Sequence, residues 1–575
     1  MRKKNILIAI LMMIVGAVIL LGSCSDSGNQ IDTMPVQSSD NNSEVTTESP
    51  SSTTQTEETK MFSLYGEYDA VFPKPEQREK LYIVQSVPQS SDDLLTLVSL
   101  QGLLARNSKS GIIIEYDSSV KSYTSMLRSY YSDVCKMTYS SGLWSTVSSE
   151  IDSVDGYILT DRGDDSINVA NSLAAQLNAI IVTENNRAAA ENRGLKCLLD
   201  VSDKDDAWLR QSEYWDKLDK DIAFMINTGY TEHLRDYAIF CGSYVFSDSD
   251  DTPKKLTDRV GHMNDNFIVF GWNTACGEFD TVKTFASING SIIASDFAKN
   301  LSALSAFSLN EAHQKTEAAE SASADKHTVC FVISDGDNLQ WTLNDFQTSD
   351  KWWANKKRGD FYTGWGLPAS MIDVAPAALQ YYYRTMKETD EFIMQLSGIG
   401  YTFPSYWRSI SALRSMQEQL ASLMGRAGMS VMEILDDAKL NDTLVQRYYS
   451  GFLDHEEIDG ILYIDYSNYA GYGGQIFWSN DKPIVTARHR VWAGFTDVTQ
   501  LASEINRAST DPSSEDAYSF IIVHAWSGLD SKGNIVANGN TLDAVAAIVE
   551  KLDPDVEVVT PSELIKRITK NVSHD

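Results

Sequence analysis

Four acidic side chains in the second half of the chain follow, or lie at the end of, short apolar runs typical of β-strands. They are Asp335, Asp337, Glu433 and Asp465. Two carboxyl groups, one protonated and one ionised, are what the cleavage of a glycosidic bond usually requires. Carboxyl groups at an apolar rim can have their pKa values pushed apart in this way. The residue types therefore indicate acid–base or nucleophilic chemistry, and the sequence leaves open which two act and whether the outcome is retention or inversion.

Each of these acids also has a structural interpretation. Asp335-Gly336-Asp337-Asn338 would serve as a turn that caps the next helix. Glu433 and Asp465 would equally suit salt bridges at a rim.

Cationic, imidazole and aromatic side chains accompany the acids. His489, Arg490 and His524 also follow or end strand-like runs, where they would contact sugar hydroxyls or a carboxylate, although a histidine in such a place is often a structural hydrogen-bonding group. A guanidinium grips a carboxylate with two hydrogen bonds and would suit an acidic sugar. The rings that we expect near a substrate are Trp365, Tyr401, Tyr406, Trp407 and Trp526.

The elements that must position these residues follow a regular pattern from residue 325 to 575. Eight strand-like runs occur, at 327–333, 364–371, 391–396, 429–434, 460–464, 483–487, 518–523 and 556–559. Helical periodicity follows most of them. Eight βα units in a segment of this length predict a (β/α)8, TIM-barrel-like domain, whose active site lies at the carboxyl ends of the strands. A loop rich in glycine and tyrosine at 466–475 stands where a helix would be expected, and it would either line the site or be a surface excursion.

Residues 61–310 alternate apolar runs with helical periodicity and predict an α/β domain with a mostly parallel sheet. The predicted strands are 81–87, 111–115, 156–160, 179–183, 222–227 and 267–270. No glycine-rich phosphate-binding motif follows any of these runs, so we predict no nucleotide cofactor.

The segment Ser397-Gly398-Ile399-Gly400-Tyr401-Thr402-Phe403-Pro404 follows the apolar run that ends at Leu396. Its glycines allow close backbone approach and its proline restrains the chain, so the turn is suited to holding aromatic rings. This segment resembles the signature of the GxGYxYP family of bacterial glycoside hydrolases, with Phe403 where the family name has tyrosine.

Further motifs share this resemblance, which extends over nearly all of the chain after the leader. They are 100–102, 271–273, 334–338, 482–483 and 488–490. The resemblance implies an amino-terminal and a carboxy-terminal family domain, at 61–310 and 325–575, and a carbohydrate substrate.

The first 24 residues have the pattern of a bacterial lipoprotein leader. Basic residues at 2–4 precede an apolar run at 6–21, and Leu21-Gly22-Ser23-Cys24 resembles a lipobox. We expect cleavage before Cys24, lipidation of its sulfur and attachment of an extracytoplasmic protein to a membrane, the alternative being an uncleaved amino-terminal anchor. Residues 25–60 are rich in serine and threonine and predict a disordered tether.

The overall charge bears on the partners of the chain. Its 48 basic and 79 acidic residues give a net charge of −31, which argues against nucleic acid as a partner because that interaction needs a basic surface. The cysteines have no CxxC spacing, and we expect most of them to be buried free thiols.

Two other functions fit the same residues. A non-catalytic lipoprotein that captures glycans would use the same rings and lipid anchor. A polysaccharide deacetylase would share the early aspartate turn and a late histidine such as His524, but the HxxxH pair of its metal site is missing. A calcium loop at 335–338 lacks the later ligands of an EF-hand, and we predict neither a metal nor an organic cofactor.

Overall fold

The computed structural model describes residues 62–63 and 70–574, except 77, 117–119, 121–122, 126, 129–134, 141, 310–311, 313 and 315–324. The expected leader, lipobox and tether lie outside the described residues. All described residues belong to one unit of the chain, residues 55–575. Among them, no helix combines the length and the apolar character needed to cross a membrane.

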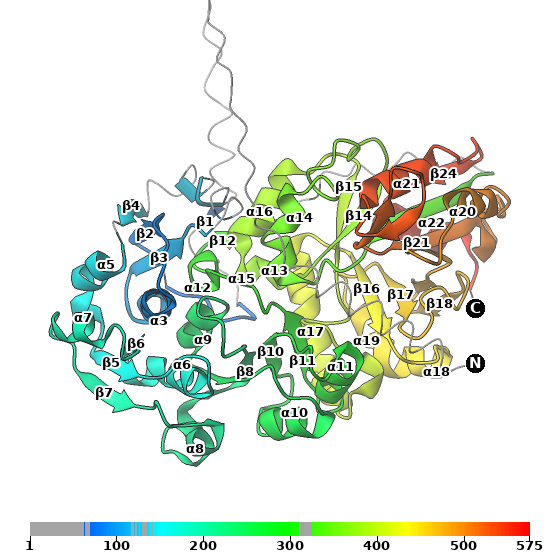
Figure 1. Ribbon diagram of the computed structural model, residues 1–575. Coiled ribbons are helices and arrows are strands. Elements are labelled where there is room, and N and C mark those ends of the chain that lie inside the picture. The colour runs from blue at the N-terminus through cyan, green and yellow to red at the C-terminus, as the bar shows by residue number, and fades with distance from the viewer. Residues whose placement is uncertain are drawn as a thin grey trace, which may run out of the picture. The chain divides into compact units, whose positions relative to one another are not determined.

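A curled, mainly parallel sheet forms the centre of the C-terminal region (Figure 1). Its strands in spatial order are β18 (Ile476–Ser479), β19 (Lys482–Thr486), β17 (Gly460–Asp465), β16 (Val431–Asp436), β15 (Asp390–Met394), β14 (Thr363–Leu367), β13 (His327–Ile333), β21 (Tyr518–Val523) and β20 (His489–Val491). Only β18 runs antiparallel to its neighbour. Ala487 N donates to Tyr463 O of β17 and Arg488 N donates to Phe520 O of β21, so two consecutive residues between β19 and β20 connect strands near opposite ends of the strand order.

All eight predicted runs form strands, but the eight-stranded barrel is not confirmed. The last run, β24 (Val556–Val558), pairs only with the first half of β13. It can lie there because β14 pairs with β13 only at Val332 and Ile333. β21 pairs directly with β13, in the place that an eighth strand would occupy in a TIM barrel. A run of apolar residues identifies a strand without identifying its neighbours.

Helices close the sheet on its outer side and at its amino end. They include α14 (Asp345–Thr348), α16 (Pro376–Thr385), α17 (Ile410–Ala427), α20 (Val498–Ile505), α21 (Thr541–Val549) and α22 (Pro561–Asn571). A Cβ on Gly364 or Gly460 would lie 2.6 or 2.7 Å from side-chain atoms of α22. The two glycines therefore let α22 lie against the amino ends of β14 and β17, which leaves the carboxyl ends for a site.

The N-terminal region contains three small parallel sheets rather than the single, mostly parallel sheet that we predicted. Their strand orders are β3-β2-β4, β6-β5-β7 and β11-β10-β8-β9. The strands are β2 (Lys80–Val84), β3 (Ser110–Ile114), β4 (Lys136–Ser140), β5 (Gly156–Leu159), β6 (Ala179–Val182), β7 (Cys197–Asp200), β8 (Asp219–Met225), β9 (Ser243–Phe246), β10 (Ile268–Gly271) and β11 (Ser291–Ala294). All six predicted strands are present.

The buried helix α3 (Ser91–Asn107) explains why the first two sheets stay separate. It lies between them: Gln101 Nε2 donates to Ile112 O in one sheet and Thr96 Oγ1 donates to Ile181 O in the other. A helix with buried residues on all sides is surrounded by protein. Because α3 lies between the two groups of strands, they form two separate sheets.

The segment 397–407 joins the two regions of the chain. Tyr401 and Ile292 of β11 exchange backbone hydrogen bonds of 2.7 and 3.0 Å in an antiparallel bridge. A Cβ on Gly400 would lie 2.8 Å from Ile292 O, which explains why this position is glycine. On the other side, the fully buried Asp436 accepts hydrogen bonds from the backbone and hydroxyl of Ser405. The segment is therefore a clasp between the N-terminal sheet and the curled sheet.

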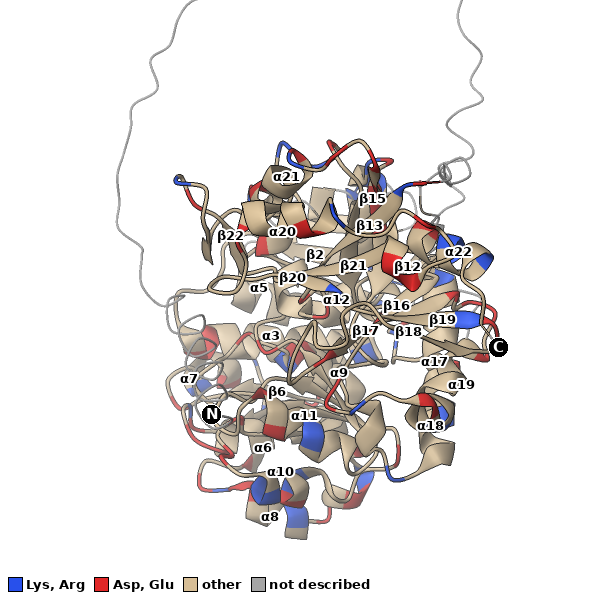
Figure 2. Ribbon diagram, turned by 90° about the vertical axis from the view of Figure 1, so that its right-hand side faces the viewer, with Lys and Arg blue, Asp and Glu red and all other residues tan. Residues whose placement is uncertain are grey.

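Acidic and basic residues are mixed on the surface helices. Figure 2 shows both charges on α8 (Asp206–Gln211) and α10 (Pro253–Val260). Arg259 of α10 lies 2.5 Å from Asp206 of α8 and 2.8 Å from Asp250.

The described cysteines are free thiols in different environments. Cys135 and Cys330 are buried, Cys241 and Cys276 are partly exposed, and Cys197 is exposed. Two of these five are buried, so the expectation for most of them is not met: Cys197 lies in the edge strand β7, Cys241 ends a helix and Cys276 lies in a turn, where an apolar sequence neighbourhood does not ensure burial.

Candidate active site

Strand register sorts the polar side chains of the curled sheet onto two faces. Paired residues of parallel strands point to the same side, and sides alternate along each strand. Met394 pairs with Met432, so the next residues, Gln395 and Glu433, share a face. We call the face that carries Gln395 and Glu433 the inner face.

The turn after β13 is pinned to this inner face. Gly336 N donates a 2.9 Å hydrogen bond to Gln395 Oε1, and Gln395 Nε2 donates to Ile333 O at 3.2 Å. A Cβ on Gly336 would lie 1.8 Å from the carbonyl oxygen of Gly366, so only glycine allows this approach. Asp335 and Asp337 flank Gly336 and are thereby held beside Glu433.

The carboxyl groups at this point have unequal environments. Burial, and then the charge of Asp335, raise the pKa of Asp337 to about 8. Burial also raises the pKa of Glu433 well above its ordinary value, against the effect of its hydrogen bond with Gln395. Glu433 is 2% exposed, whereas Asp335 is partly exposed. Asp337 thus keeps its proton near neutral pH, the pKa of Glu433 is shifted in the same direction, and Asp335 is partly exposed to solvent.

A fourth carboxyl group comes from the N-terminal region. Glu278 is the first residue of α11 (Glu278–Ala286), and its Oε1 accepts a 3.0 Å hydrogen bond from the Tyr401 hydroxyl. Burial raises the pKa of Glu278 to about 7, partly opposed by that hydrogen bond, and Asp335 adds to the rise. The electrostatic coupling of Glu278 to Asp335 and Asp337 places it in the same acidic cluster.

Aromatic and imidazole rings form a wall beside the acids. The rings of Trp492 and His524 stack at 3.8 Å, and Tyr469 meets Trp492 edge-on at 4.8 Å. Burial lowers the pKa of His524, with Asp335 acting in the opposite direction, so this ring is neutral near pH 7. Tyr469 belongs to the loop 466–475 and is coupled to Glu278, Asp335 and Glu433. This loop contacts the site at Tyr469.

Several predicted site residues lie elsewhere. Asp465 pairs with Asp436 on the outer face and caps its own turn by accepting from Ser467 N at 2.8 Å. Trp365 lies between Gly364 and Gly366 in β14, so it points to the outer face, where it is fully buried and donates to Asp390 Oδ1. His489 also points to the outer face and lies 3.7 Å from Glu504. Strand alternation excludes these three side chains from the inner face.

The predicted rings of the clasp, and Trp526 after β21, are mostly packing groups. Tyr401 is 4% exposed and Trp407 is 2% exposed, with its Nε1 bonded to Thr402. The hydroxyl of Tyr406 donates to Asp437 at 3.1 Å. Trp526 is partly exposed and packs against Trp341 and Trp352. Of these rings, Tyr401 reaches the acidic cluster through its hydroxyl.

Sequence reasoning missed Glu278, Gln395 and Tyr469 as members of the site. The motif Gly271-Trp272-Asn273 was a signal for Glu278, because it ends a parallel strand shortly before α11. The ring of Trp272 lies parallel to that of Tyr401 at 6.5 Å, which places this strand end next to the clasp.

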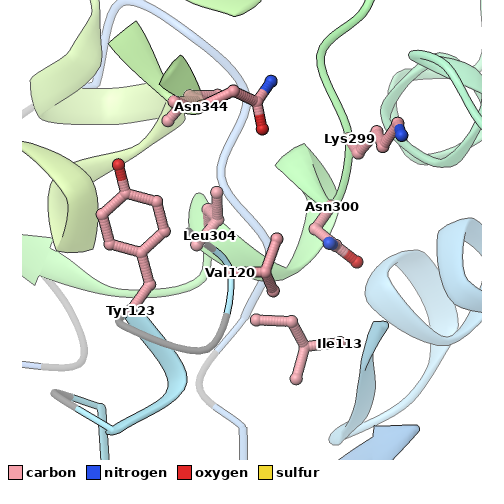
Figure 3. Close-up of a pocket in the computed structure, with 8 residues that line it drawn as sticks. Ile113, Val120, Tyr123, Lys299, Asn300, Leu304 and Asn344 are labelled. Atoms are coloured by element: carbon pink, nitrogen blue, oxygen red, sulfur yellow. The ribbon is translucent and has the colours of Figure 1, made fainter. Parts of the chain in front are cut away.

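A small cavity lies apart from this cluster, between β3 and the turn at Leu343 and Asn344 (Figure 3). The cavity offers a volume of about 10 Å³ to the centre of a water molecule. That is about the space one water molecule needs, so this cavity does not fit a sugar.

Family models match three segments of the chain. Residues 325–569 match the "GxGYxYP putative glycoside hydrolase C-terminal domain". Residues 154–218 and 222–306 match the second and third domains of the N-terminal part of the same family. The chain belongs to the GxGYxYP family. Together the three matches span most of the described residues.

A solved structure agrees with this membership. A crystal structure titled as a putative hydrolase from Bacteroides thetaiotaomicron VPI-5482 is similar to the chain with a TM-score of 0.76 and 25% sequence identity. The similarity covers 87% of this chain and 97% of that one. No curated protein matches the chain.

The GxGYxYP signature now has a structural meaning in this member. Gly400 permits the bridge to β11, Tyr401 holds Glu278, and the fully buried Phe403 packs against Phe279 and Tyr466 at 5.7 and 5.5 Å. A tyrosine hydroxyl is not needed for this packing, which accounts for phenylalanine at 403.

Proposed function

We propose that the protein hydrolyses glycosidic bonds of an oligosaccharide or polysaccharide at the carboxyl ends of the curled sheet. The observation that carries the proposal is the unequal environment of Asp335 and Asp337 on one short turn. A buried, protonated acid next to a solvent-facing carboxylate is the combination that glycosidases use. The family membership supports the same substrate class.

In this proposal Asp337 donates its proton to the leaving glycosidic oxygen as that bond breaks. Asp335 either attacks the anomeric carbon as a nucleophile, forming a glycosyl ester that water then hydrolyses, or takes a proton from the water that attacks this carbon. Glu433 is hydrogen-bonded to Gln395 and contributes a second buried carboxyl group whose pKa is raised. Its Oε2 is buried and has no hydrogen-bond partner among the described residues.

The test is a hydrolysis screen of the parent protein, followed by amide variants at single positions. Asp335→Asn and Asp337→Asn should each lower the rate of glycan cleavage by about 10²- to 10⁴-fold, because an amide neither donates an acidic proton nor acts as a carboxylate. Asp465→Asn is the matched comparison, since Asp465 lies on the outer face, and it should keep a rate within about threefold of the parent.

Near-parental rates in both turn variants would contradict the proposed mechanism. A parent that binds glycans and cleaves none would instead identify a glycan-capture protein.

We also propose that the protein is exported and held to a membrane by a lipid on Cys24. The pattern of the first 24 residues supports this proposal. A lipid-anchored position outside the cytoplasm would place the site where extracellular glycans arrive.

A further inference from the structure

The three residues Arg488, His489 and Arg490 have different surroundings. Arg488 donates to Tyr518 O, to Asp516 Oδ1 and to Glu515 O at 3.0 to 3.1 Å, so its hydrogen-bonding capacity is used inside the protein. Arg490 has no such partners: among the described residues, no carboxylate oxygen lies within 4 Å of its guanidinium.

Arg490 lies on the same face as Glu433. It pairs with Ile522, Ile522 pairs with Val332, and Val332 pairs with Gly364 of β14. Gly364 in turn pairs with Glu391, which is four residues before Gln395 on β15. Because paired residues share a side and sides alternate, the register carries the inner face from Glu433 across the sheet to Arg490.

The guanidinium of Arg490 is held in place by a ring rather than by hydrogen bonds. Its Cζ lies 4.2 Å from the centroid of Phe495, a side chain that is 58% exposed. Stacking on an aromatic face orients a guanidinium and leaves its N–H donors free. Burial lowers the pKa of Arg490, with the hydroxyl of Tyr469 acting in the opposite direction, so this cation is partly desolvated beside the acidic cluster.

The neighbouring acids do not prevent an anion from approaching. Asp337, Glu433 and Glu278 have raised pKa values, so the cluster carries less negative charge at neutral pH than its composition implies. A partly buried cation without a counter-ion is costly, and a ligand anion would offset that cost.

We propose that the glycan bound at this site carries an anionic group, a uronic acid carboxylate or a sulfate ester, and that Arg490 binds this group. This inference rests on the proposed function and adds the substrate class. The ring of Phe495 orients the guanidinium, which binds the anion with N–H donors that have no hydrogen-bond partner among the described residues.

The experiment compares binding and cleavage of charged and neutral glycans by the full chain. The parent, Arg490→Gln and Arg447→Gln are each titrated with oligogalacturonate, a sulfated oligosaccharide and a neutral oligosaccharide of the same length, and each is assayed for cleavage of the corresponding polysaccharides. Arg447 is the matched control because it is exposed and lies over the ring of Tyr448 at 5.2 Å, on the outer helical segment η6 (Val445–Tyr449).

Under the proposal the parent prefers one of the two anionic glycans, and Arg490→Gln weakens its binding by about 10- to 100-fold. Arg447→Gln should behave like the parent, and binding should weaken as salt is raised. Preference for oligogalacturonate identifies a carboxylate as the recognised group, and preference for the sulfated glycan identifies a sulfate.

Each remaining outcome separates this inference from the proposed function. Cleavage of a neutral glycan that is unchanged in Arg490→Gln overturns the inference and leaves hydrolysis standing. Binding of an anionic glycan through Arg490 without any cleavage supports the inference and overturns hydrolysis. A parent that neither binds nor cleaves any of the glycans overturns both.

Discussion

The hydroxyl of Tyr401 donates a 3.0 Å hydrogen bond to Oε1 of Glu278. Tyr401 belongs to the clasp after β15, and Glu278 begins helix α11 of the N-terminal region. One hydrogen bond therefore connects the family signature to a carboxyl group that is more than 100 residues away in the sequence. The N-terminal region supplies part of the acidic cluster, so the candidate site requires both regions.

Replacing Tyr401 separates its packing from its hydrogen bond. Tyr401→Ala removes a ring that is 4% exposed and should lower the free energy of unfolding by about 3–5 kcal/mol. Tyr401→Phe keeps the ring and should cost only about 1 kcal/mol, while the pKa of Glu278 rises because the donor that lowers it is lost. Urea unfolding of both variants measures the difference, and equal losses would show that the ring contributes nothing beyond its hydroxyl.

Asp337 should make stability depend on pH in a defined direction. In the unfolded chain an aspartate ionises near pH 4, whereas in the folded protein Asp337 keeps its proton up to about pH 8. The folded state therefore binds more protons between these values, so its stability relative to the unfolded state falls as pH rises through this window. Asp337→Asn cannot ionise, and it should melt a few degrees above the parent at pH 8 and close to it at pH 4.

Thermal melts of the parent and of Asp337→Asn at several pH values measure this effect. A difference in melting temperature that stays constant from pH 4 to pH 8 would mean that Asp337 does not hold a proton in the folded protein. If Asp337 is also the general acid, the cleavage rate of the parent should fall as pH rises through about 8.

Gly336→Ala should damage the site more than the fold. The added Cβ would lie 1.8 Å from the carbonyl oxygen of Gly366, so the turn that carries Asp335 and Asp337 must move away from Gln395. We expect a loss of glycan cleavage of at least about 10²-fold, since small displacements of catalytic groups have effects of this size. Kinetics beside a melting curve test this, and a parental rate would show that the turn need not be fixed.

Cys24→Ala should release the protein from membranes. A thioether-linked diacylglycerol supplies two acyl chains, which is enough for stable attachment. Fractionation of cells that express the parent or the variant would show the difference. Unchanged partitioning of the variant into the membrane fraction would contradict the lipobox interpretation and favour an uncleaved amino-terminal anchor.

The sequence by itself determined most of the local structure. All fourteen strands that were predicted from apolar runs are present in the structure, because burial of both faces in a parallel sheet leaves a continuous apolar signal. It also identified the family through Gly398, Gly400 and Tyr401, and it marked Asp335, Asp337, Glu433, Arg490 and His524 as polar side chains near strand ends.

Only the tertiary structure decided which of these side chains meet. Asp465 and Trp365 were as plausible as Glu433 in the sequence, but alternation along the strands points them to the outer face. The place of β24 beside β13, and of Glu278 beside Tyr401, depends on pairings between residues far apart in the chain. Local patterns reflect burial and backbone conformation, whereas strand neighbours and contacts between distant segments are set by how the whole chain packs.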